Sequence, residues 1–387
     1  MKKGNRFDET PRQRCRVCRN ALSAGSLLRY RGMPVAAQSF PEAHTIGLDR
    51  GSDLSVFQCP VCGLVQLDAK PVPYHREVIR AAAFSDEMRR FRRSQFKEWI
   101  GRYGLAEKSI LEVGCGRGEY LSLLNECGVD AHGLEYSAAS VTICKELGLS
   151  AQRGYIGDAK KLVSGAPFDG FMTLNFLEHW PNPCASLRGI ASNLSVGGVG
   201  LVEVPNFDMI LEKQLFSEFI SDHLLYFTRE TLSFTLQSSG FQVLECTSVW
   251  HDYILSAVVR KRPITDLSAL DSRRSELADA LRAFIQSCLS GRVAIWGAGH
   301  QALAVIALTG IAPSVRYVVD SAPFKQGKFT PATHLPIVPP SALESDPVDA
   351  IVVMAASYSD EVAAIIRTRY GPEISVAILR DHGLEVW

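Results

Sequence analysis

The sequence predicts an α/β protein in three parts: a four-cysteine domain at residues 1–75, a Rossmann-like domain at 76–262 and a second Rossmann-like αβα domain at 263–387. Two Cys-x-x-Cys pairs define the first part. In each of the other two, a short apolar segment runs into a glycine-rich turn and then a helical pattern, the repeating unit of doubly wound folds. A proline-marked change of composition after Arg262 separates these two parts.

The composition is that of an ordinary globular protein, with 47% hydrophobic and 21% charged residues in a chain of 387. That length is enough for two or three hydrophobic cores. Lys and Arg total 41 and equal Asp and Glu, so an extended nucleic-acid surface is not expected. No apolar segment has the character of a signal peptide or a membrane span, and six scattered cysteines fit a reducing compartment, so we expect a cytoplasmic protein.

The four cysteines of the first part lie in two pairs, Cys15 with Cys18 and Cys59 with Cys62. Each pair presents two thiolates from one short turn, so together they supply the tetrahedral shell that zinc prefers. Two disulfides or chance spacing are the alternatives, but paired Cys-x-x-Cys motifs in a reducing setting indicate metal. Four sulfur ligands close the shell, so we predict one structural zinc ion per chain and expect the chemistry elsewhere.

Basic residues are concentrated at the N-terminus, where Met1–Gly32 holds nine Lys or Arg and two acidic residues. A basic zinc ribbon could grip nucleic acid through its phosphates. Aromatic side chains on which bases could stack do not alternate with these basic residues, so nucleic acid is not the expected partner. A solvated arm, or a patch that meets a phosphorylated small substrate, is the alternative explanation.

The central domain begins with "KSILEVGCGRGEYLSLLNECGVDAHGLEYS", in which we expect a buried strand at Ile110–Val113 and a helix at about Glu119–Cys127. A second strand ends at Glu135, where an acid can accept hydrogen bonds from the two hydroxyls of a ribose. The glycines of the first turn let the backbone approach a ligand closely; they are Gly114, Gly116 and Gly118. This spacing alone would also suit a nicotinamide dinucleotide.

The segments after Glu135 supply three further strands and a hairpin. "YIGDAKKL" places Asp158 after a third strand, "PFDGFMTLNFLEHWPNP" contains a fourth that ends at Asn175, and "LSVGGVGLVEVPN" feeds a fifth. "FQVLECTSVWHDYILSAVVRK" then predicts two strands in hairpin order. In this combination the domain resembles the class I S-adenosylmethionine-dependent methyltransferases, whose sheet closes with a reversed last strand.

That resemblance implies S-adenosylmethionine as the cofactor and a set of residues that hold it. The three glycines would cradle its amino-acid part, Glu135 would bind the ribose, and Asp158 or its neighbour Ala159 would bind the adenine. Asn175 would lie near the methionine end, and Glu112 would orient the loop or bind the cofactor amine.

The C-terminal domain repeats the strand, glycine turn and helix in "RVAIWGAGHQALAVIALTGI". Its turn holds Gly297 and Gly299, with Ala302 where a third glycine would stand, and a second strand ends at Asp320. A separate bound NAD is one interpretation. The other is an αβα lobe whose turn packs on the substrate cleft or on its own helix.

The three parts in this order resemble one family over nearly the whole chain, the nucleotide-sugar C-methyltransferases of deoxysugar biosynthesis. "WGAG" and "VVDSAPFKQGKFTPATHLPIVPP" are the most telling segments, because generic methyltransferases have nothing there. The resemblance implies an N-terminal zinc-binding domain, a C-terminal domain on the substrate side, and methylation of a carbon beside the ketone of a nucleotide-linked 4-keto sugar. No metal would take part in the reaction.

Methylation at carbon requires a base, because the proton beside the ketone must leave before an enolate can attack a methyl group. His223 stands where the family has its base, in a Tyr-His-Glu-His element that is Ile-Ser-Asp-His at residues 220–223, and Asp222 would tune it. The family's His-Gly-Gly-Ser turn is His-Asp-Tyr-Ile at residues 251–254. His223 could instead be a packing residue. His179 would line the substrate mouth or be an ordinary structural histidine.

Two other functions stay open on the sequence. One is an O- or N-methyltransferase of another small metabolite on the same three-part frame. The other is a non-catalytic binding protein whose basic zinc ribbon recognises nucleic acid or a protein. We expect a monomeric enzyme with a small-molecule substrate, a nucleotide-linked sugar, and no membrane association.

Overall fold

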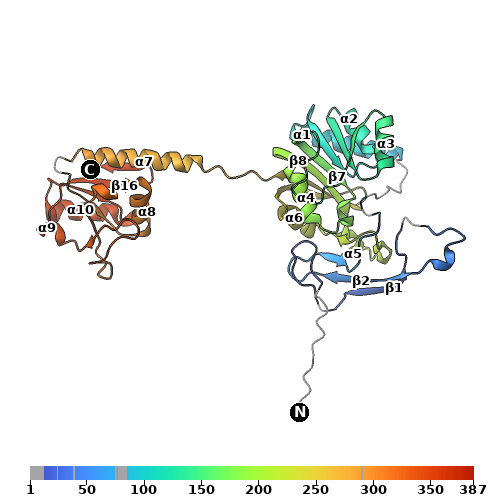
Figure 1. The fold of residues 1–387 in the computed structure, drawn as a ribbon, viewed down its shortest axis with the longest axis horizontal. Coiled ribbons are helices and arrows are strands. Elements are labelled where there is room, and N and C mark those ends of the chain that lie inside the picture. The colour runs from blue at the N-terminus through green and yellow to red at the C-terminus, as the bar shows by residue number, and fades with distance from the viewer. Residues whose placement is uncertain (1–12, 24, 38–39, 75, 77–84, 289–290) are drawn as a thin grey trace, which may run out of the picture. The chain divides into compact units, whose positions relative to one another are not determined.

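The computed structural model describes residues 13–23, 25–37, 40–74, 76, 85–288 and 291–387 of the chain. The chain forms two compact units, Met1–Pro263 and Ile264–Trp387 (Figure 1). The further division of the first unit at residues 75 and 76 stays a prediction. Residues 1–12 of the basic N-terminal segment lie outside the described part of the chain.

The N-terminal part of the first unit is a small antiparallel sheet in the order β1-β2-β3-β9. Its strands are β1 (Leu28–Met33), β2 (Ser52–Gln58), β3 (Val65–Leu67) and β9 (Leu225–Tyr226), and η1 (Ile46–Leu48) lies between β1 and β2. β9 comes from the central part of the chain, where Tyr226 pairs with Val65. The four-cysteine segment is therefore joined to the central part by a shared sheet, and it anchors the backbone next to His223.

The central sheet has seven strands in the order β10-β11-β8-β7-β4-β5-β6. The strands are β4 (Ser109–Val113), β5 (Asp130–Glu135), β6 (Ser150–Arg153), β7 (Phe168–Leu174), β8 (Leu194–Pro205), β10 (Phe241–Val249) and β11 (Ile254–Lys261). β11 runs antiparallel to β8 and β10, whereas β4 to β8 are mutually parallel. The predicted Rossmann-like sheet with a reversed last strand is confirmed.

Helices connect these strands and cover the sheet. They are α1 (Asp86–Tyr103), α2 (Glu119–Glu126), α3 (Ala138–Glu146), η2 (Leu177–His179), α4 (Pro183–Ser192), α5 (Phe207–Glu212), η3 (Phe216–Glu218) and α6 (Arg229–Gln237). β4 is apolar on both faces because both are covered: Ile110 packs in one cluster with Phe96 of α1, and Leu111 packs in another with Leu187 of α4. Packing on both faces thus fixes the central strands, whose carboxyl ends carry the candidate site residues.

The second unit is a separate six-stranded sheet in the order β14-β13-β12-β15-β16-β17, parallel except for β17. Its strands are β12 (Val293–Trp296), β13 (Tyr317–Val319), β14 (Ile337–Val338), β15 (Ala350–Val353), β16 (Ser375–Arg380) and β17 (Gly383–Val386). Its helices are α7 (Ser268–Gln286), α8 (His300–Thr309), η4 (Ala312–Ser314), α9 (Ala342–Ser345), η5 (Ala356–Tyr358) and α10 (Ser359–Tyr370). The predicted second Rossmann-like domain is confirmed.

The glycine turn of the second unit is bonded to its own domain. Gly297 has φ +121°, and a Cβ there would lie 2.5 Å from the Met354 carbonyl oxygen. Asp320 Oδ2 accepts hydrogen bonds of 2.8 Å from the Ala298 N–H and from Lys325 Nζ. This carboxylate is thus paired with Lys325 as well as bonded to the turn, and the choice between a packed turn and a bound NAD stays a prediction.

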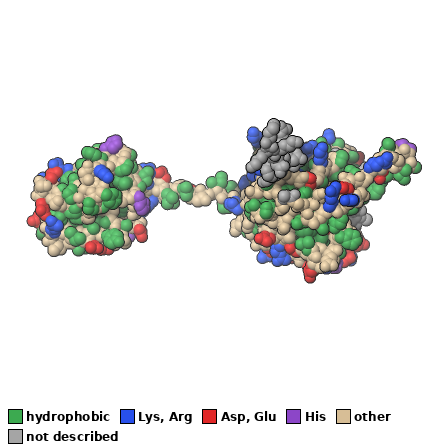
Figure 2. Space-filling view, turned by 90° about the horizontal axis from the view of Figure 1, so that it is seen from below, with side chains coloured by type: hydrophobic (Ala, Val, Ile, Leu, Met, Phe, Trp, Pro, Cys, Tyr) green, Lys and Arg blue, Asp and Glu red, His purple; other side chains and the backbone are tan. Residues whose placement is uncertain are grey.

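The surface carries both signs of charge. On the face shown in Figure 2, basic and acidic side chains of the first unit are interspersed with apolar ones outside the grey atoms. Among the described residues, no helix is both long enough and apolar enough to cross a membrane.

Candidate active site and zinc site

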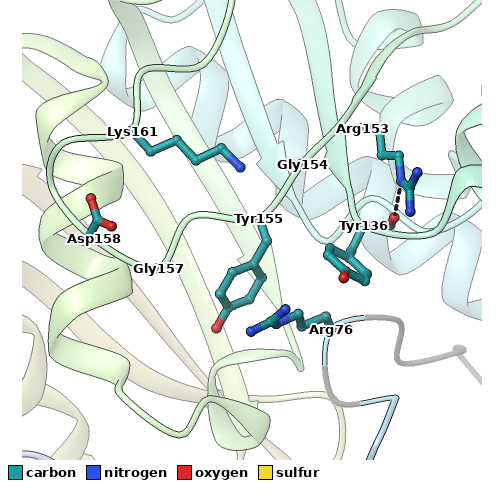
Figure 3. Close-up of a pocket in the computed structure, with 8 residues that line it drawn as sticks. All are labelled: Arg76, Tyr136, Arg153, Gly154, Tyr155, Gly157, Asp158 and Lys161. Atoms are coloured by element: carbon teal, nitrogen blue, oxygen red, sulfur yellow. Dashed lines mark hydrogen bonds between the residues drawn. The ribbon is translucent and has the colours of Figure 1, made fainter.

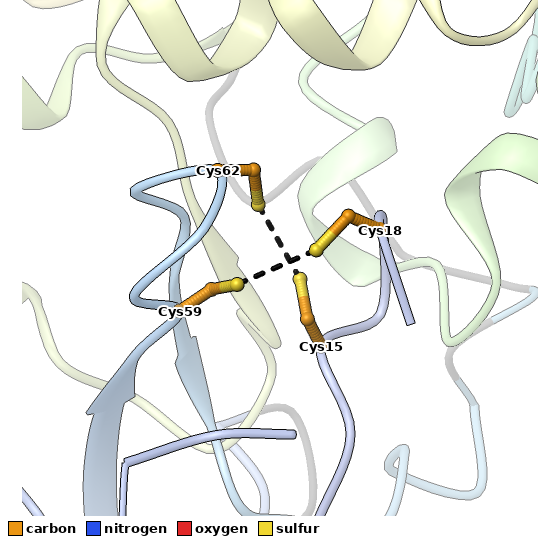
Figure 4. A group of neighbouring side chains, drawn as sticks. All are labelled: Cys15, Cys18, Cys59 and Cys62. Atoms are coloured by element: carbon orange, nitrogen blue, oxygen red, sulfur yellow. Dashed lines mark hydrogen bonds between the residues drawn. The ribbon is translucent and has the colours of Figure 1, made fainter. Parts of the chain in front are cut away.

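The four N-terminal cysteines meet at one point. Their sulfur atoms lie within 4.8 Å of one another, with Cys15 Sγ 3.5 Å from Cys62 Sγ and Cys18 Sγ 3.4 Å from Cys59 Sγ. Figure 4 shows the sulfurs converging from two turns, one before β1 and one between β2 and β3. All four cysteines are free thiols, so the disulfide alternative is not seen here.

This arrangement fits a tetrahedral zinc ion. Zn–S bonds of about 2.3 Å separate the sulfurs of a regular tetrahedron by about 3.8 Å. The two short sulfur–sulfur distances, 3.4 and 3.5 Å, are close to that edge. Cys15 and Cys59 are buried while Cys18 and Cys62 are half-buried, so an ion held here would be enclosed by protein.

The glycine turn after β4 has two kinds of glycine. A Cβ on Gly114 would lie 2.5 Å from Phe176, and a Cβ on Gly118 would lie 2.5 Å from Leu149, so these two are required by protein packing. A Cβ on Gly116 would meet only Glu119 Oε2, at 3.7 Å. Gly116 has φ +56° and so adopts the left-handed conformation that favours glycine. Of the three, Gly116 is therefore the one that faces space for a ligand.

Glu135 lies at the end of β5 and is 5% exposed. Its Oε2 accepts a hydrogen bond of 3.0 Å from the Gly116 N–H, and its Oε1 accepts one of 2.8 Å from the Ser137 N–H. The structure thus brings the predicted ribose acid and the predicted glycine turn together. A carboxylate can accept more than two hydrogen bonds, so this geometry is compatible with the predicted binding of a ribose.

A hollow of about 500 Å³ opens beside Glu135, at the carboxyl ends of β5 and β6 (Figure 3). Asp158 lines it, with its Oδ1 accepting the Lys160 N–H at 2.8 Å, whereas Ala159 is not among the lining residues. Arg76 lies over the rings of Tyr136 and Tyr155, at 5.3 and 5.0 Å from their centroids. A flat, electron-rich adenine could stack in the same way against these groups, so the hollow suits the adenine end of the cofactor.

Asn175 and Glu112 flank the turn from neighbouring strands. Asn175 follows β7 with φ +49°, donates its N–H to the Glu203 carbonyl at 2.8 Å and is exposed at the strand end. A non-glycine residue in the left-handed region at a strand end is typical of functional sites. Glu112 is fully buried in β4, behind the turn, so its position suits support of the loop.

Arg92 on α1 is a residue that the sequence reasoning missed. It is fully buried, and its Nη1 donates to Glu203 Oε2. Its Nε and Nη2 have no hydrogen-bond partner among the described residues, although its guanidinium lies 5.3 Å from the ring centroid of Tyr120, in the first turn of α2. Two unbonded N–H groups of a buried cation call for an anion. The methionyl carboxylate of S-adenosylmethionine is such an anion, and Arg92 lies against Tyr120 of α2, the helix that follows the glycine turn.

The two predicted histidines are neighbours. His179 is 4% exposed, and its ring centroid lies 4.8 Å from that of His223. His179 Nδ1 is 2.7 Å from the Asp222 carbonyl oxygen, which fixes Nδ1 as the protonated nitrogen because a carbonyl can only accept. Burial, followed by the nearby His179, lowers the pKa of His223 to about 3. His223 is thus a neutral imidazole at physiological pH and can accept a proton.

The Asp222 carboxylate has other partners than His223. Its Oδ1 accepts the Tyr74 hydroxyl at 2.7 Å, and its Oδ2 accepts the Ala37 N–H at 2.8 Å. The predicted tuning of His223 by this carboxylate is therefore not seen among the described residues. Tyr74 and Asp222 instead line a second hollow, of about 860 Å³, together with Ile220 and the residues that follow β1.

Two family models match the chain. A model described as a methyltransferase domain matches residues 88–246, and one described as a C-methyltransferase C-terminal domain matches residues 265–371. The C-methyltransferase NovU of Streptomyces niveus is 22% identical over 396 aligned residues, which cover 91% of each chain. The ubiquinone biosynthesis O-methyltransferase of Azoarcus sp. (strain BH72) is 30% identical over 107 residues, which are 26% of this chain and 46% of that one.

Solved structures resemble the central part. A S-adenosylmethionine-dependent methyltransferase from Clostridium acetobutylicum ATCC 824 has a TM-score of 0.38 and 12% identity, and the match covers 49% of this chain and 96% of that one.

The fold and the cofactor-binding geometry, taken with the family models, define a S-adenosylmethionine-dependent methyltransferase. The C-methyltransferase C-terminal model at residues 265–371 and the relative matched over 91% of both chains agree with the methyltransferase model, and together they support a S-adenosylmethionine-dependent C-methyltransferase.

Proposed function

We propose that the enzyme methylates a nucleotide-linked keto sugar at a carbon beside the ketone. The observation that carries the proposal is the contact between the buried His179, which follows β7 of the methyltransferase sheet, and the half-buried His223. Methylation of oxygen or nitrogen starts from an atom with its own lone pair, whereas methylation of carbon needs a base to generate the nucleophile. The likeness to a C-methyltransferase over most of the chain supports carbon as the acceptor atom.

S-Adenosylmethionine, when bound, supplies a methyl group that is open to attack by a nucleophile. In this chain the Gly116 turn would approach the amino-acid part of the cofactor, and Glu135 would bind its ribose. Asp158 would lie at its adenine, and Arg92 would bind its carboxylate. The work of the protein is then to align the acceptor carbon with that methyl group and to exclude water.

His223 is the group that removes the acceptor proton. Its neutral imidazole can take the proton from the carbon beside the ketone and leave an enolate. His179 would orient it, because the His179 ring contacts the His223 ring and is itself fixed by the bond from Nδ1 to the Asp222 carbonyl, next to His223 in the chain. Tyr74 and Asp222 would bind the sugar from the 860 Å³ hollow that they line.

Zinc bound by the four cysteines would be structural in this proposal. A shell of four thiolates leaves no open position for water or substrate. Because the sheet of the cysteine segment includes β9, two residues beyond His223, the ion would also stabilise the backbone that carries the base.

The test is an analysis of the methylated product. The enzyme is given a thymidine diphosphate-linked 4-keto sugar and S-adenosylmethionine with a ¹³C-labelled methyl group. We expect a new carbon–carbon bond next to the ketone in the NMR spectrum of the product. A label found on oxygen or nitrogen would show that the enzyme is an O- or N-methyltransferase. Failure to bind S-adenosylhomocysteine would contradict a catalytic role.

A further inference from the structure

A buried carboxyl group lies beside the two histidines. Glu178 precedes His179 in η2 and is 1% exposed. A side-chain oxygen of Glu178 and a ring nitrogen from each of His179 and His223 all lie within 4.8 Å of one another. Oε1 is 3.7 Å from His179 Nε2, and Oε2 has no hydrogen-bond partner among the described residues. A buried polar atom of this kind has bonding capacity that a ligand can use.

The surroundings of Glu178 favour its neutral form. The titratable groups that face it are His179, His223 and Tyr253, whose hydroxyl donates to Glu218 at 2.8 Å. The Asp222 carbonyl fixes the proton of a neutral His179 on Nδ1, so the other ring nitrogen, 3.7 Å from Glu178 Oε1, carries a lone pair. A lone pair at this distance disfavours a carboxylate and is compatible with a protonated carboxyl. Burial also raises the pKa of Glu178 to about 8.

Enolisation calls for two groups, a base at carbon and a proton donor at oxygen. Without the donor, the negative charge that leaves the carbon accumulates on the ketone oxygen. A carboxylic acid kept neutral at pH 7 by burial can serve as that donor. His223, the base, and Glu178 lie within 4.8 Å of each other, so an acceptor whose carbon is held at His223 would have its neighbouring ketone oxygen within reach of Glu178.

We propose that Glu178 is the general acid of the reaction and protonates the ketone oxygen of the acceptor while His223 removes the proton from the adjacent carbon. The inference rests on the proposed function, since it needs a ketone. The C–H bond breaks and its electron pair forms the C=C bond, the C=O π pair takes the Glu178 proton, and an enol results. In the methyl transfer, the C=C pair of the enol would form the bond to the methyl group, and the methyl–sulfur bond would break with its electron pair left on the cofactor sulfur. The O–H proton returns to Glu178, the C=O bond re-forms, and His223 gives its proton to water.

This arrangement leaves the net charge of the buried site unchanged during enolisation. Two neutral side chains become a carboxylate and an imidazolium within 4.8 Å of each other. Creating both charges together costs less than creating either alone, because each buried charge then has a partner. The same pairing raises the proton affinity of His223 at the moment when it must accept a proton.

The experiment measures proton exchange without methyl transfer. Enzyme saturated with S-adenosylhomocysteine is mixed with a thymidine diphosphate 4-keto-6-deoxyhexose deuterated at the two carbons beside the ketone. Loss of deuterium is followed by mass spectrometry from pH 6 to pH 9.5. Because the neutral acid is required, wild-type exchange should be constant at lower pH and fall tenfold per pH unit well above about 8, where Glu178 ionises.

Glu178→Gln should lower exchange by about 10²–10³-fold, within the usual contribution of a positioned acid, and should abolish the alkaline fall. Glu230→Gln, which changes an exposed acid on α6, is the matched control and should keep the wild-type profile. Melting curves and calorimetry with S-adenosylhomocysteine check that each variant is folded. If Glu178→Gln unfolds, Glu178→Asp is used in its place. The shorter acid should be better solvated, so the fall of its exchange rate at alkaline pH should begin at a lower pH than in wild type.

The outcomes separate this inference from the proposed function. No exchange at any pH by wild-type enzyme that binds the sugar would contradict enolisation itself. Exchange by wild type with the same alkaline fall in Glu178→Gln would overturn the role of Glu178 and leave the function intact. A second metal equivalent per chain that Glu178→Gln removes would also overturn it, because the glutamate would then be a metal ligand.

Discussion

The backbone N–H of Gly116 donates a hydrogen bond of 3.0 Å to Glu135 Oε2, so the glycine turn after β4 and the acid at the end of β5 form one unit. The other oxygen of the same carboxylate holds the N–H of Ser137, the N-cap residue of α3. Glu135 therefore has two tasks. It holds the turn and the start of α3 in place, and in our proposal it also accepts the ribose hydroxyls of the cofactor.

Glu135→Ala should weaken S-adenosylhomocysteine binding by about 10–150-fold, or about 1.5–3 kcal/mol, the range for a hydrogen bond to a charged group. Isothermal calorimetry measures the change directly. Glu146→Ala, at the exposed end of α3, is the control and should bind as wild type does. If wild type, Glu135→Ala and Glu146→Ala all bound S-adenosylhomocysteine equally well, Glu135 would not be a cofactor-binding residue.

Gly116→Ala should abolish cofactor binding without unfolding the protein. The new Cβ meets only Glu119 Oε2 at 3.7 Å, so the protein tolerates it, but it stands where the ligand must approach. Gly128→Ala is the matched control, because Gly128 also has a positive φ, +85°, and its Cβ meets no atom within 4 Å. Both variants carry the backbone strain of roughly 1 kcal/mol, so a loss of binding only at Gly116 isolates the steric effect.

Arg92 should recognise the cofactor's carboxylate. Wild-type enzyme should bind S-adenosylmethionine about 10–150-fold more tightly than decarboxylated S-adenosylmethionine, because one charge-assisted bond is at stake. Arg92→Met would leave Glu203 buried and unpaired, so the test uses Arg92→Met combined with Glu203→Gln.

In that double variant the two ligands should bind equally. The comparison of two ligands on one protein cancels any general loss of stability. A preference that survives in the double variant would show that another group binds the carboxylate, and Arg92 would then serve only the ion pair with Glu203.

The sequence predicted those parts of the fold and site that depend on local patterns. The strand, turn and helix around Gly116, the acid at 135 and the paired cysteines are all marked by residues within a few positions of one another. Arg92 was missed because its signal is non-local. It lies on an amphipathic helix as an ordinary charged residue, and only burial against Glu203, 111 positions away, reveals two unbonded N–H groups.

The same reason explains Asp222. Adjacent to His223 in the chain, it was expected to act on that ring, but its carboxylate turns to Ala37, 185 residues away, and Tyr74, 148 residues away. The joining of the cysteine segment to the central part through β9 could not be predicted either, since a strand of two residues leaves no periodic pattern.

Purified protein should contain one equivalent of zinc, and Cys59→Ser should lower the melting temperature by roughly 5 °C or more. Cys184→Ser, which changes a buried cysteine outside the cluster, is the control for loss of a thiol and should retain the metal. Metal content is measured by plasma emission spectrometry. If a chelator stopped turnover at once while the melting curve and sugar binding stayed unchanged, zinc would have a chemical and not a structural role.

His223→Asn should lower deuterium exchange of a 4-keto nucleotide sugar by about 10²–10⁴-fold while both ligands still bind. Asn keeps the size and polarity of the side chain but cannot accept the proton. Because the pKa of His223 is lowered to about 3, its neutral form is already complete well below pH 5, so wild-type exchange should not fall between pH 8 and pH 5 on account of this group. A fall centred near pH 6.5 would identify a solvated histidine as the base instead.

Asp222→Asn distinguishes catalysis from architecture at the neighbouring position. Its amide can still accept from Tyr74 or from the Ala37 N–H but loses the charge that strengthens both bonds, so the main effect should be on stability and sugar affinity. Exchange at saturating sugar should stay within about threefold of wild type, because the contact of residue 222 with His179 is through its main-chain carbonyl, which the substitution leaves in place. If exchange at saturating sugar fell as much as in His223→Asn, the Asp222 carboxylate would be required for the action of the base, His223.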